Sequence, residues 1–231
     1  MPDGAPKFHW RADPEYRYLV AALNGAGKST LMAVLAAACA QGRKEFLVVL
    51  LDPKGDKAMR TLQPMPSHTL RRTGGGIQRF VVPPREVDRE GITEEICRAA
   101  FYRGNVVLVI DELQMLADDR RYPVSLFQCY AQGRARKIPI IAASTEPVRI
   151  PVWARSQCRG FFCGEIGEGT QRDYMSDLMC QDRKRFKDRM HALQRYHFLY
   201  WEHDWGHARE PEDVWVRPPA PAGAAKGKRR G

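Results

Sequence analysis

The chain carries one segment whose residue types and spacing fit the binding of a polyphosphate: Ala22-Leu23-Asn24-Gly25-Ala26-Gly27-Lys28-Ser29-Thr30. It matches the phosphate-binding loop pattern, with Ala22 where the first glycine usually stands. Gly25 and Gly27 would let backbone N–H groups curl around a β-phosphate, and a helix that follows would present its positive end to the same anion. In this pattern Lys28 reaches the β- and γ-phosphates and the Ser29 hydroxyl coordinates Mg²⁺. We therefore expect residues 24–30 to bind ATP with Mg²⁺.

A pair of carboxylates ends an apolar run further along the chain, in Val106-Val107-Leu108-Val109-Ile110-Asp111-Glu112. Ligands of open α/β sheets bind at the carboxyl ends of the strands, so Asp111 is placed to hold Mg²⁺ there. Glu112 can polarise an attacking water as a general base. Enzymes that hydrolyse nucleoside triphosphates need such a base, whereas a small-molecule kinase receives its acceptor hydroxyl with the substrate. The pair therefore favours hydrolysis.

Strands that alternate with helices are expected to position these residues. Continuous apolar runs predict strands, and helical patterns that stop at a glycine predict helices. We expect strands at 16–22, 46–51, 106–110, 138–143 and 160–163, and helices at 29–41, 93–103 and 124–132. Gly42, Gly104 and Gly133 are expected to end the three helices. This alternation predicts an α/β fold with a mostly parallel sheet and helices on both faces.

Composition predicts one folded domain with two flexible ends. The 231 residues suit one domain, and 44% hydrophobic residues exclude wholesale disorder. We expect an N-terminal arm at 1–15, a folded domain at 16–210 and a flexible basic tail at 211–231, because the tail is rich in proline, alanine and glycine. Within the domain, prolines and a run of three glycines predict a mobile basic loop at 64–84.

Positive charge exceeds negative charge, with 37 Lys and Arg against 27 Asp and Glu, a formal net charge of +10. Such an excess favours a polyanionic partner, either nucleic acid or an acidic surface. The candidate DNA contacts lie in the predicted loop and tail: Arg71, Arg72, Arg79, Lys226, Lys228, Arg229 and Arg230. Acidic residues are mixed into the basic stretch at 183–195, which we interpret as a solvated helix face. The aromatic residues at 196–205 are interpreted as a late strand on the sheet, with base stacking as the alternative.

Neither a membrane span nor a disulfide framework is expected. The longest apolar run, at 31–40, is shorter than the ~20 residues that cross a bilayer, and no secretory signal is visible at the N-terminus. The six cysteines contain no CxxC pair and stand at scattered spacings. These features favour a reducing, intracellular setting.

These motifs together resemble the additional-strand class of P-loop NTPases and, within it, the HerA/FtsK superfamily. The superfamily's DPKG segment is similar to residues 46–56, F-L-V-V-L-L-D-P-K-G-D, and its later motifs are similar to D-E-L-Q at 111–114, G-R-A-R-K-I-P-I-I-A-A-S-T-E-P at 133–147 and Ile150-Pro151. The likeness covers residues 16–165. It implies a RecA-like P-loop NTPase fold and a homo-oligomeric ring, expected to be a hexamer, that moves DNA or partners through its pore. A chain of this length most resembles the genome-packaging ATPases of membrane-containing double-jelly-roll viruses.

The resemblance also implies roles for residues near the end of the matched region. Arg134 occupies the family's arginine position, from which it could reach the γ-phosphate of a neighbouring subunit, and Arg136 is the fallback. Thr145 stands where the family usually has the glutamine that orients the lytic water, and Ser144 could share this role. The catalytic set implied by motif and resemblance is Glu112, Lys28, Arg134 and Thr145.

Viral genome packaging into a capsid is the activity that the resemblance favours, in the host cytoplasm, at the packaging vertex of the virion, or both. Capsid or membrane vertex proteins would then be further partners. Two alternatives stay open. One is a small-molecule or nucleotide kinase, which Glu112 and the absence of an obvious Arg-rich lid disfavour. The other is a Zot-like ATPase that drives virion assembly or export, although the usual membrane anchor of such proteins is not seen.

Overall fold

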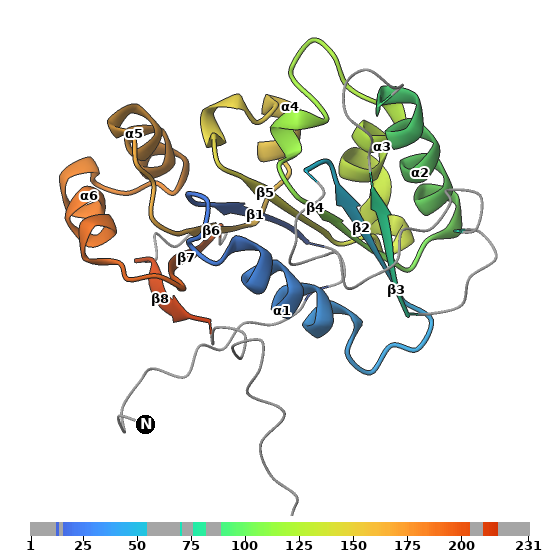
Figure 1. Ribbon diagram of the computed structural model, residues 1–231, viewed down its shortest axis with the longest axis horizontal. Helices are drawn as coiled ribbons and strands as arrows, with labels where there is room; N and C mark the ends of the chain where they lie inside the picture. The colour runs from blue at the N-terminus through green and yellow to red at the C-terminus, as the bar shows by residue number, and fades with distance from the viewer. Residues whose placement is uncertain are drawn as a thin grey trace, which may run out of the picture.

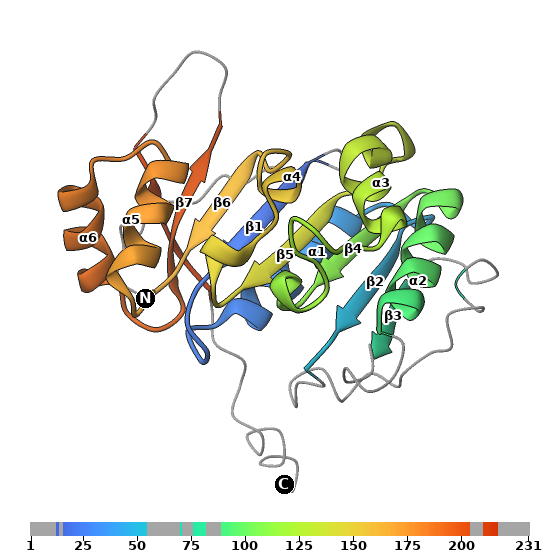
Figure 2. The ribbon, with the colours of Figure 1, turned by 90° about the horizontal axis from the view of Figure 1, so that it is seen from above.

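The computed structural model describes residues 13, 16–54, 70, 76–81, 89–203 and 210–216, with only the backbone described at 76–81. Eight strands form one sheet: β1 (Arg17–Ala21), β2 (Leu47–Asp52), β3 (Gly76–Val81), β4 (Val106–Ile110), β5 (Ile140–Ser144), β6 (Gly160–Cys163), β7 (His197–Glu202) and β8 (Glu212–Trp215). Their order across the sheet is β3-β2-β4-β5-β1-β6-β7-β8. Figure 2 shows the strands from β7 to β3 side by side in this order.

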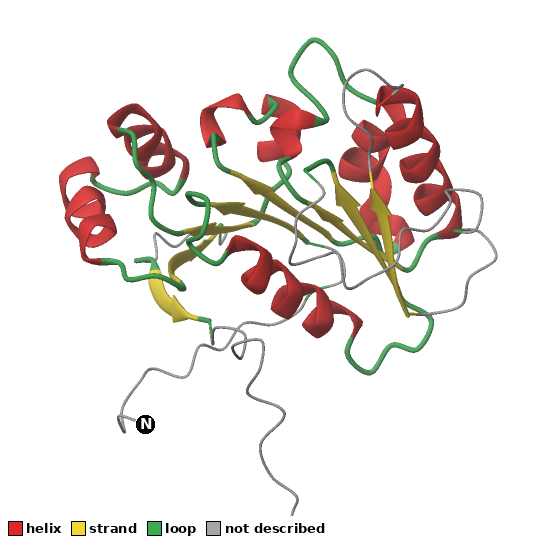
Figure 3. Ribbon diagram, in the orientation of Figure 1, coloured by secondary structure: helices red, strands yellow, loops and turns green. Residues whose placement is uncertain are grey.

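Helices cover both faces of the sheet, as predicted. The α-helices are α1 (Lys28–Ala40), α2 (Arg89–Arg103), α3 (Val124–Gln132), α4 (Val152–Arg155), α5 (Gly169–Leu178) and α6 (Arg183–Ala192). Short 3₁₀ helices are η3 (Leu113–Met115), η4 (Gly133–Arg136) and η5 (Pro147–Arg149). Helix α1 packs on one face and α2, α3 and α4 on the other (Figures 1 and 3). Helices α5 and α6 share the second face, because Met175 and Phe186 pack in the same cluster as α2 and α3.

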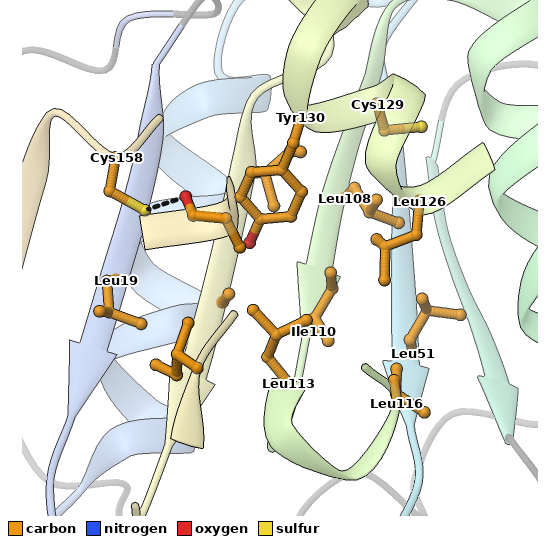
Figure 4. Packing of buried hydrophobic residues seen from close by; sticks show 14 of the residues in the cluster. Leu19, Leu51, Leu108, Ile110, Leu113, Leu116, Leu126, Cys129, Tyr130 and Cys158 are labelled. Atoms are coloured by element: carbon orange, nitrogen blue, oxygen red, sulfur yellow. Dashed lines mark hydrogen bonds between the residues drawn. The ribbon is translucent and has the colours of Figure 1, made fainter. Parts of the chain in front are cut away.

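Two hydrophobic layers result from the alternation of side chains along the strands. On β1, Leu19 packs with the layer under α2 and α3, while Tyr18 and Val20 pack with the layer under α1. Figure 4 shows part of the first layer, where Leu108 and Ile110 of β4 face Leu126 and Tyr130 of α3. Strands covered on both faces must be apolar throughout, which is why the continuous apolar runs predicted them correctly.

The topology brings the predicted site residues to one edge of the sheet. Strand β5 lies between β1 and β4 and is parallel to both, with Ala21 opposite Ser144 and Ile110 opposite Ala142. Strand β5 is thus inserted between the strand that precedes the phosphate-binding loop and the strand that precedes Asp111. The additional-strand class of P-loop NTPases is named for a strand in this position. Because β1, β2, β4 and β5 are parallel, the segments that follow their carboxyl ends meet at the same edge.

Strand β7 is antiparallel to β6 and β8 and is the only strand of the described sheet that runs in the opposite direction. Strand β8 corrects the predicted start of the tail at 211, because Tyr200 of β7 pairs with Glu212 and His197 pairs with Trp215. Pro211, Val214 and Val216 are the buried residues of the described segment 210–216, which is too short an apolar signal to predict a strand. Residues 217–231, and the arm at 1–15 apart from Asp13, lie outside the described residues.

Strand β3 corrects the predicted loop at 64–84. Residues 76–81 form an edge strand parallel to β2, with Leu47 opposite Gly76 and Asp52 opposite Val81. Leu70 is fully buried in the layer that contains α2 and α3. The neighbouring prolines and glycines outweighed the short strand signal of I-Q-R-F-V at 77–81. The other residues of the predicted loop lie outside the described residues.

Two of the three predicted helix-ending glycines adopt the left-handed conformation, Gly42 at φ 73° and Gly104 at φ 65°. Gly133 does not, since its φ is −64° and the chain continues into η4. A Cβ at Gly133 would lie 3.2 Å from Cβ of Ile138 and 3.3 Å from a guanidinium nitrogen of Arg17. Close packing therefore explains this glycine, and Lys137 takes the left-handed conformation instead, at φ 53°.

Among the described residues, no helix is long and apolar enough to cross a membrane. All six cysteines are free thiols, and five of them are buried. Buried free cysteines act as small apolar side chains, which agrees with the absence of a disulfide pattern in the sequence.

Candidate nucleotide-binding site

The turn between β1 and α1 has the backbone geometry of an anion cradle. Gly25 and Gly27 have φ values of 82° and 107°, in the left-handed region that favours glycine. Helix α1 begins at Lys28 with no side-chain cap at its N-terminus. The first turn of a helix presents its N–H groups and the positive end of the helix dipole to an anion placed there.

The side chain of Lys28 lies inside the phosphate-binding loop. Its side chain is 6% exposed, and Nζ donates hydrogen bonds to the carbonyl oxygens of Ala22 at 2.8 Å and Leu23 at 3.1 Å. The same Nζ lies 3.7 Å from Oε1 of Glu112. Burial lowers the pKa of Lys28, and the charge of Glu112 opposes that shift. The ammonium thus stands between the loop and the predicted general base.

Glu112 is the most constrained residue of the site. It is fully buried and has a left-handed backbone, at φ 56° and ψ 65°. Oε2 accepts hydrogen bonds from the backbone N–H and Oγ1 of Thr145, both at 2.9 Å, and from Nε2 of Gln114. Oε1 accepts from Nζ of Lys54. Burial acts to raise the pKa of Glu112, but these hydrogen bonds and the charge of Lys28 together lower it, so the carboxylate stays charged.

Asp111 precedes Glu112 and is 3% exposed at the carboxyl end of β4. Its backbone N–H donates to the carbonyl of Leu51 at 3.0 Å, which fixes it beside β2. Burial raises the pKa of Asp111 to about 6, and the negative charge of Glu112 adds to the rise. A buried carboxylate with a raised pKa gains from a nearby cation, as expected for a Mg²⁺ ligand.

Lys54 was not assigned a role from the sequence, although it stands in the segment that resembles DPKG. Its Nζ forms the ion pair with Glu112 and also lies 3.3 Å from Oδ1 of Asn24 in the phosphate-binding loop. Lys54 therefore links the loop, the end of β2 and the predicted base. Its position one residue beyond Asp-Pro at the end of a buried strand was the available signal.

Gln114 and Thr145 complete the surroundings of Glu112. Nε2 of Gln114 lies 3.3 Å from Oγ1 of Thr145, and Oε1 of Gln114 has no hydrogen-bond partner among the described residues. Ser144, the alternative to Thr145, accepts a hydrogen bond from the N–H of Glu146 at 2.9 Å and is fully buried. Of the two residues, Thr145 is therefore the one that contacts the predicted base. Gln114 was missed as a site residue because its side chain reaches back from η3.

Two residues from far along the chain support the loop from behind. Nε of Arg195 donates to the carbonyl of Gly25 at 2.8 Å, and the N–H of Tyr196 donates to the carbonyl of Ala26 at 3.0 Å. A Cβ at Gly27 would lie 2.5 Å from Cδ1 of Tyr196, so this ring requires glycine there. From the sequence, Arg195 was expected on the basic helix and Tyr196 on the late strand, and neither position indicates this contact.

Arg134 lies at the other edge of the sheet. It belongs to η4, which precedes the amino end of β5, whereas Lys28 and Glu112 follow the carboxyl ends of β1 and β4. Arg134 is exposed and does not contribute to the site of its own chain. Arg136, the fallback, stacks over the ring of Phe101 with its guanidinium carbon 4.6 Å from the ring centroid.

The candidate DNA contacts Arg71, Arg72, Lys226, Lys228, Arg229 and Arg230 lie outside the described residues. Arg79 is placed on β3 by its backbone alone. The basic helix α6 forms ion pairs with acidic residues, among them Arg183 with Asp177 at 2.6 Å and Lys187 with Asp173 at 2.7 Å. The interpretation of this helix as a solvated face is therefore confirmed.

The residues present fit Mg²⁺ as it is usually bound beside a nucleotide. Among the described residues, no cluster of three or more His, Cys, Asp or Glu could hold a metal by itself. Mg²⁺ needs no such cluster, because it takes one or two protein oxygens together with substrate phosphates and water. Asp111 and the half-buried Ser29 stand at the same edge of the sheet and can supply those oxygens.

The inserted strand β5, the glycine-containing turn before α1 and the carboxylate pair after β4 define a RecA-like P-loop NTPase fold. No protein-family model and no curated protein matches the sequence. Among solved structures, the chain is similar to the genome packaging NTPase B204 of Sulfolobus turreted icosahedral virus 2 in complex with AMPPCP. The TM-score is 0.64 and the identity 13%, over 82% of this chain and 93% of that chain.

Two other solved structures have a similar fold. The pCW3 conjugation coupling protein TcpA with ATPγS matches with a TM-score of 0.57 and 14% identity, over 87% of this chain and 60% of that chain. Thermomonospora curvata EccC (ATPases 2 and 3), in complex with a signal sequence peptide, matches with a TM-score of 0.57 and 14% identity, over 94% of this chain and 46% of that chain. The fold expected from the resemblance to HerA/FtsK proteins is confirmed.

Proposed function

We propose that this protein is a Mg²⁺-dependent ATPase that assembles into a ring and translocates double-stranded DNA, in viral genome packaging. The observation that carries the proposal is Glu112, a fully buried carboxylate held by Thr145 beside Asp111 at the edge where the phosphate-binding loop lies. This arrangement suits water activation next to a γ-phosphate. A base placed to activate water favours hydrolysis over transfer to a small acceptor, so the kinase alternative is disfavoured.

The loop N–H groups and Lys28 bind the phosphates, and Ser29 and Asp111 hold Mg²⁺. Bound Mg²⁺ would neutralise charge on the phosphate oxygens. Glu112 accepts the proton of the attacking water, which requires one of its oxygens to lose a protein donor. Lys54 is the partner that can leave, because its side chain is 33% exposed and already contacts Asn24 in the loop. A γ-phosphate would attract its ammonium and release Oε1 for the water.

Ring assembly is supported by the position of Arg134. At the edge opposite to Lys28, its guanidinium cannot reach a nucleotide in the loop of its own chain but could act on one bound by another subunit. An arginine supplied in trans stabilises the charge of a phosphoryl-transfer transition state, with effects of about 10³–10⁵ in rate in other NTPases. We therefore assign Arg134 to the neighbouring active site, with Arg136 less favoured because its guanidinium stacks on Phe101.

DNA is the proposed polyanion because the net charge is +10 and a protein of similar fold is named a genome packaging NTPase. The contacts are proposed at Arg71, Arg72 and Arg79 and at Lys226, Lys228, Arg229 and Arg230. Capsid or vertex proteins are the proposed further partners, at the packaging vertex or in the host cytoplasm. Translocation of a protein substrate is the second candidate, because the EccC structure of similar fold contains a signal sequence peptide.

Hydrolysis of ATP measured with and without duplex DNA tests this function. The purified full chain should hydrolyse ATP with Mg²⁺ and should turn over faster when duplex DNA is added. Lys28→Ala is the control that should lose ATP binding. Hydrolysis that duplex DNA leaves unchanged would favour the second candidate, and phosphoryl transfer to a small acceptor in place of hydrolysis would contradict the proposal.

A further inference from the structure

A cavity of about 360 Å³ lies at the amino edge of the sheet, opposite the phosphate-binding loop. Ten residues line it, and they include three arginines and a histidine but no aspartate or glutamate. The basic residues are Arg17, Arg134, Arg159 and His203. They come from the start of β1, from η4, from the segment before β6 and from the end of β7. Three separate parts of the chain thus bring guanidinium groups to one hollow.

Arg17 lines this cavity and is almost fully buried. It is 5% exposed, and one of its guanidinium nitrogens donates to the carbonyl of Cys129 at 3.1 Å. Burial lowers the pKa of Arg17, and the positive charge of Arg134 acts in the same direction. Two guanidinium groups that repel each other across a cavity are both stabilised when an anion enters between them.

Arg159 is held in a fixed orientation at the side of the cavity. Its Nε donates to Oε1 of Glu202 at 3.0 Å, and its guanidinium carbon lies 4.3 Å from the ring centroid of Tyr16. Glu202 offsets part of its charge from outside the lining. A guanidinium whose one edge is already fixed presents its remaining N–H groups at little further cost in conformational entropy.

Tyr130 lines the cavity from α3. The residue is 1% exposed, and its hydroxyl has no hydrogen-bond partner among the described residues. Figure 4 shows its ring descending from α3 toward the sheet beside Cys158, another lining residue. The hydroxyl is enclosed, so Tyr130 contributes its ring to the cavity wall and does not contribute a donor for a ligand.

We propose that this cavity binds the phosphoryl group of a small anion, either inorganic phosphate or a nucleotide, between Arg17, Arg134 and Arg159. Arginine forks match the geometry of phosphate oxygens, and the volume falls in the range of about 300–1,000 Å³ that is usual for small-ligand sites. A hollow of this size does not admit a duplex. The site is separate from the phosphate-binding loop of its own chain and shares only Arg134 with the proposed function.

Phosphate binding to the full-length Lys28→Ala protein tests the site, because that substitution weakens phosphate binding at the loop. Isothermal titration should show saturable binding of inorganic phosphate, and phosphate should raise the melting temperature more than chloride at equal ionic strength. Adding Arg159→Gln should weaken binding by about tenfold or more. Adding Arg136→Gln is the matched control and should change nothing, since Arg136 lies on η4 but stacks on Phe101 outside the cavity.

Tyr130→Phe is a control for the cavity wall, because it removes a hydroxyl that the cavity does not expose. This variant should bind phosphate as the Lys28→Ala parent does, and in phosphate-free buffer it should melt no lower than that parent, because it loses an unpaired buried hydroxyl. Titration with ADP shows whether the site prefers a nucleotide or inorganic phosphate. Tighter binding of either anion supports the site. Three results would contradict the proposed site. These are no saturable binding of phosphate or ADP, binding that Arg159→Gln leaves unchanged, and variants that change only the binding of duplex DNA.

Discussion

Glu112 combines a left-handed backbone, complete burial and a negative charge, each of which is unfavourable alone. A non-glycine residue in such a conformation costs about 1–3 kcal/mol and persists only where its surroundings enforce it. Here the donors from Thr145, Gln114 and Lys54 do so. Strain held in place by dedicated contacts is typical of active-site residues, and the burial and backbone of Glu112 were not visible in the sequence.

Lys54→Met tests whether the ion pair between Lys54 and Glu112 restrains hydrolysis. Loss of the ammonium removes a partly exposed ion pair, so the free energy of unfolding should fall by only about 1 kcal/mol. Because Oε1 of Glu112 is then accessible to water, hydrolysis without DNA should rise and stimulation by DNA should shrink. The measurement is turnover with and without duplex DNA. Lys44→Met, on the exposed turn before β2, is the control, and unchanged basal turnover in Lys54→Met would contradict the proposed release step.

Asp111 should dominate the pH dependence of stability near neutrality. Its pKa in the folded protein is raised to about 6, above the ordinary value of 3.8, so the charged form is disfavoured by folding. Protonation removes this penalty, and stability should therefore rise by about 1–1.5 kcal/mol as pH falls from 7 to 5. The pKa of Glu112 is lowered, so its contribution is lost only at more acidic pH, below the ordinary value of 4.5. Urea unfolding of wild type and Asp111→Asn measures this, and an equal rise in both would contradict the assignment.

At the scale of elements, the sequence predicted the buried parts of the sheet better than its edges. Helix α3 and strands β4 and β6 have the predicted bounds. The two strands are covered on both faces, which leaves continuous apolar runs in the sequence. Edge strands need no such runs, which is why β3 and β8 were missed. Helix α5 was also missed, since only one face of it is buried and its sequence is polar.

The phosphate-binding loop, Asp111 and Glu112 were found because their spacing reflects chemistry. The other site residues join the site only through the fold: Lys54, Gln114, Arg195 and Tyr196.

The contact between the loop and the segment after α6 predicts different effects for two glycines. Gly25→Ala introduces a left-handed strain alone, because nothing lies within 4 Å of a Cβ there. Gly27→Ala adds a clash with the ring of Tyr196 at 2.5 Å. ATP affinity should therefore fall more in Gly27→Ala, and Tyr196→Ala should restore part of it by removing the ring. Fluorescent nucleotide titration measures this, and no recovery in the double variant would show that the ring does not set the loop geometry.

At the scale of the whole molecule, the phosphate-binding edge and the Arg134 edge lie at opposite ends of the same strands. A ring would bring one edge of each subunit to the other edge of its neighbour. The chain then supplies Lys28 and Glu112 to its own nucleotide and Arg134 to the next one. Hydrolysis in such an assembly depends on the interface, which links turnover to the positions of neighbouring subunits.

Mixed rings test this arrangement. Arg134→Ala and Glu112→Gln proteins should each be nearly inactive, but a mixture under exchange conditions should recover activity, since some interfaces then combine an intact arginine with an intact glutamate. ATP turnover against mixing ratio is the measurement. Turnover that never exceeds the separate variants would remove the role of Arg134 in trans. Full activity in a monomeric wild-type protein would contradict the ring.

Glu112→Gln compared with wild type tests most directly whether the site hydrolyses ATP with Glu112 as the base. Glutamine keeps the size of the side chain, and Lys28, Ser29 and Asp111 are unchanged, so ATP and Mg²⁺ should bind with near wild-type affinity. Single-turnover hydrolysis should fall by about 10²–10⁴. Glu94→Gln, on α2, is the control for loss of a carboxylate elsewhere and should hydrolyse ATP normally. Near-normal hydrolysis in Glu112→Gln, with ATP binding intact, would contradict the account.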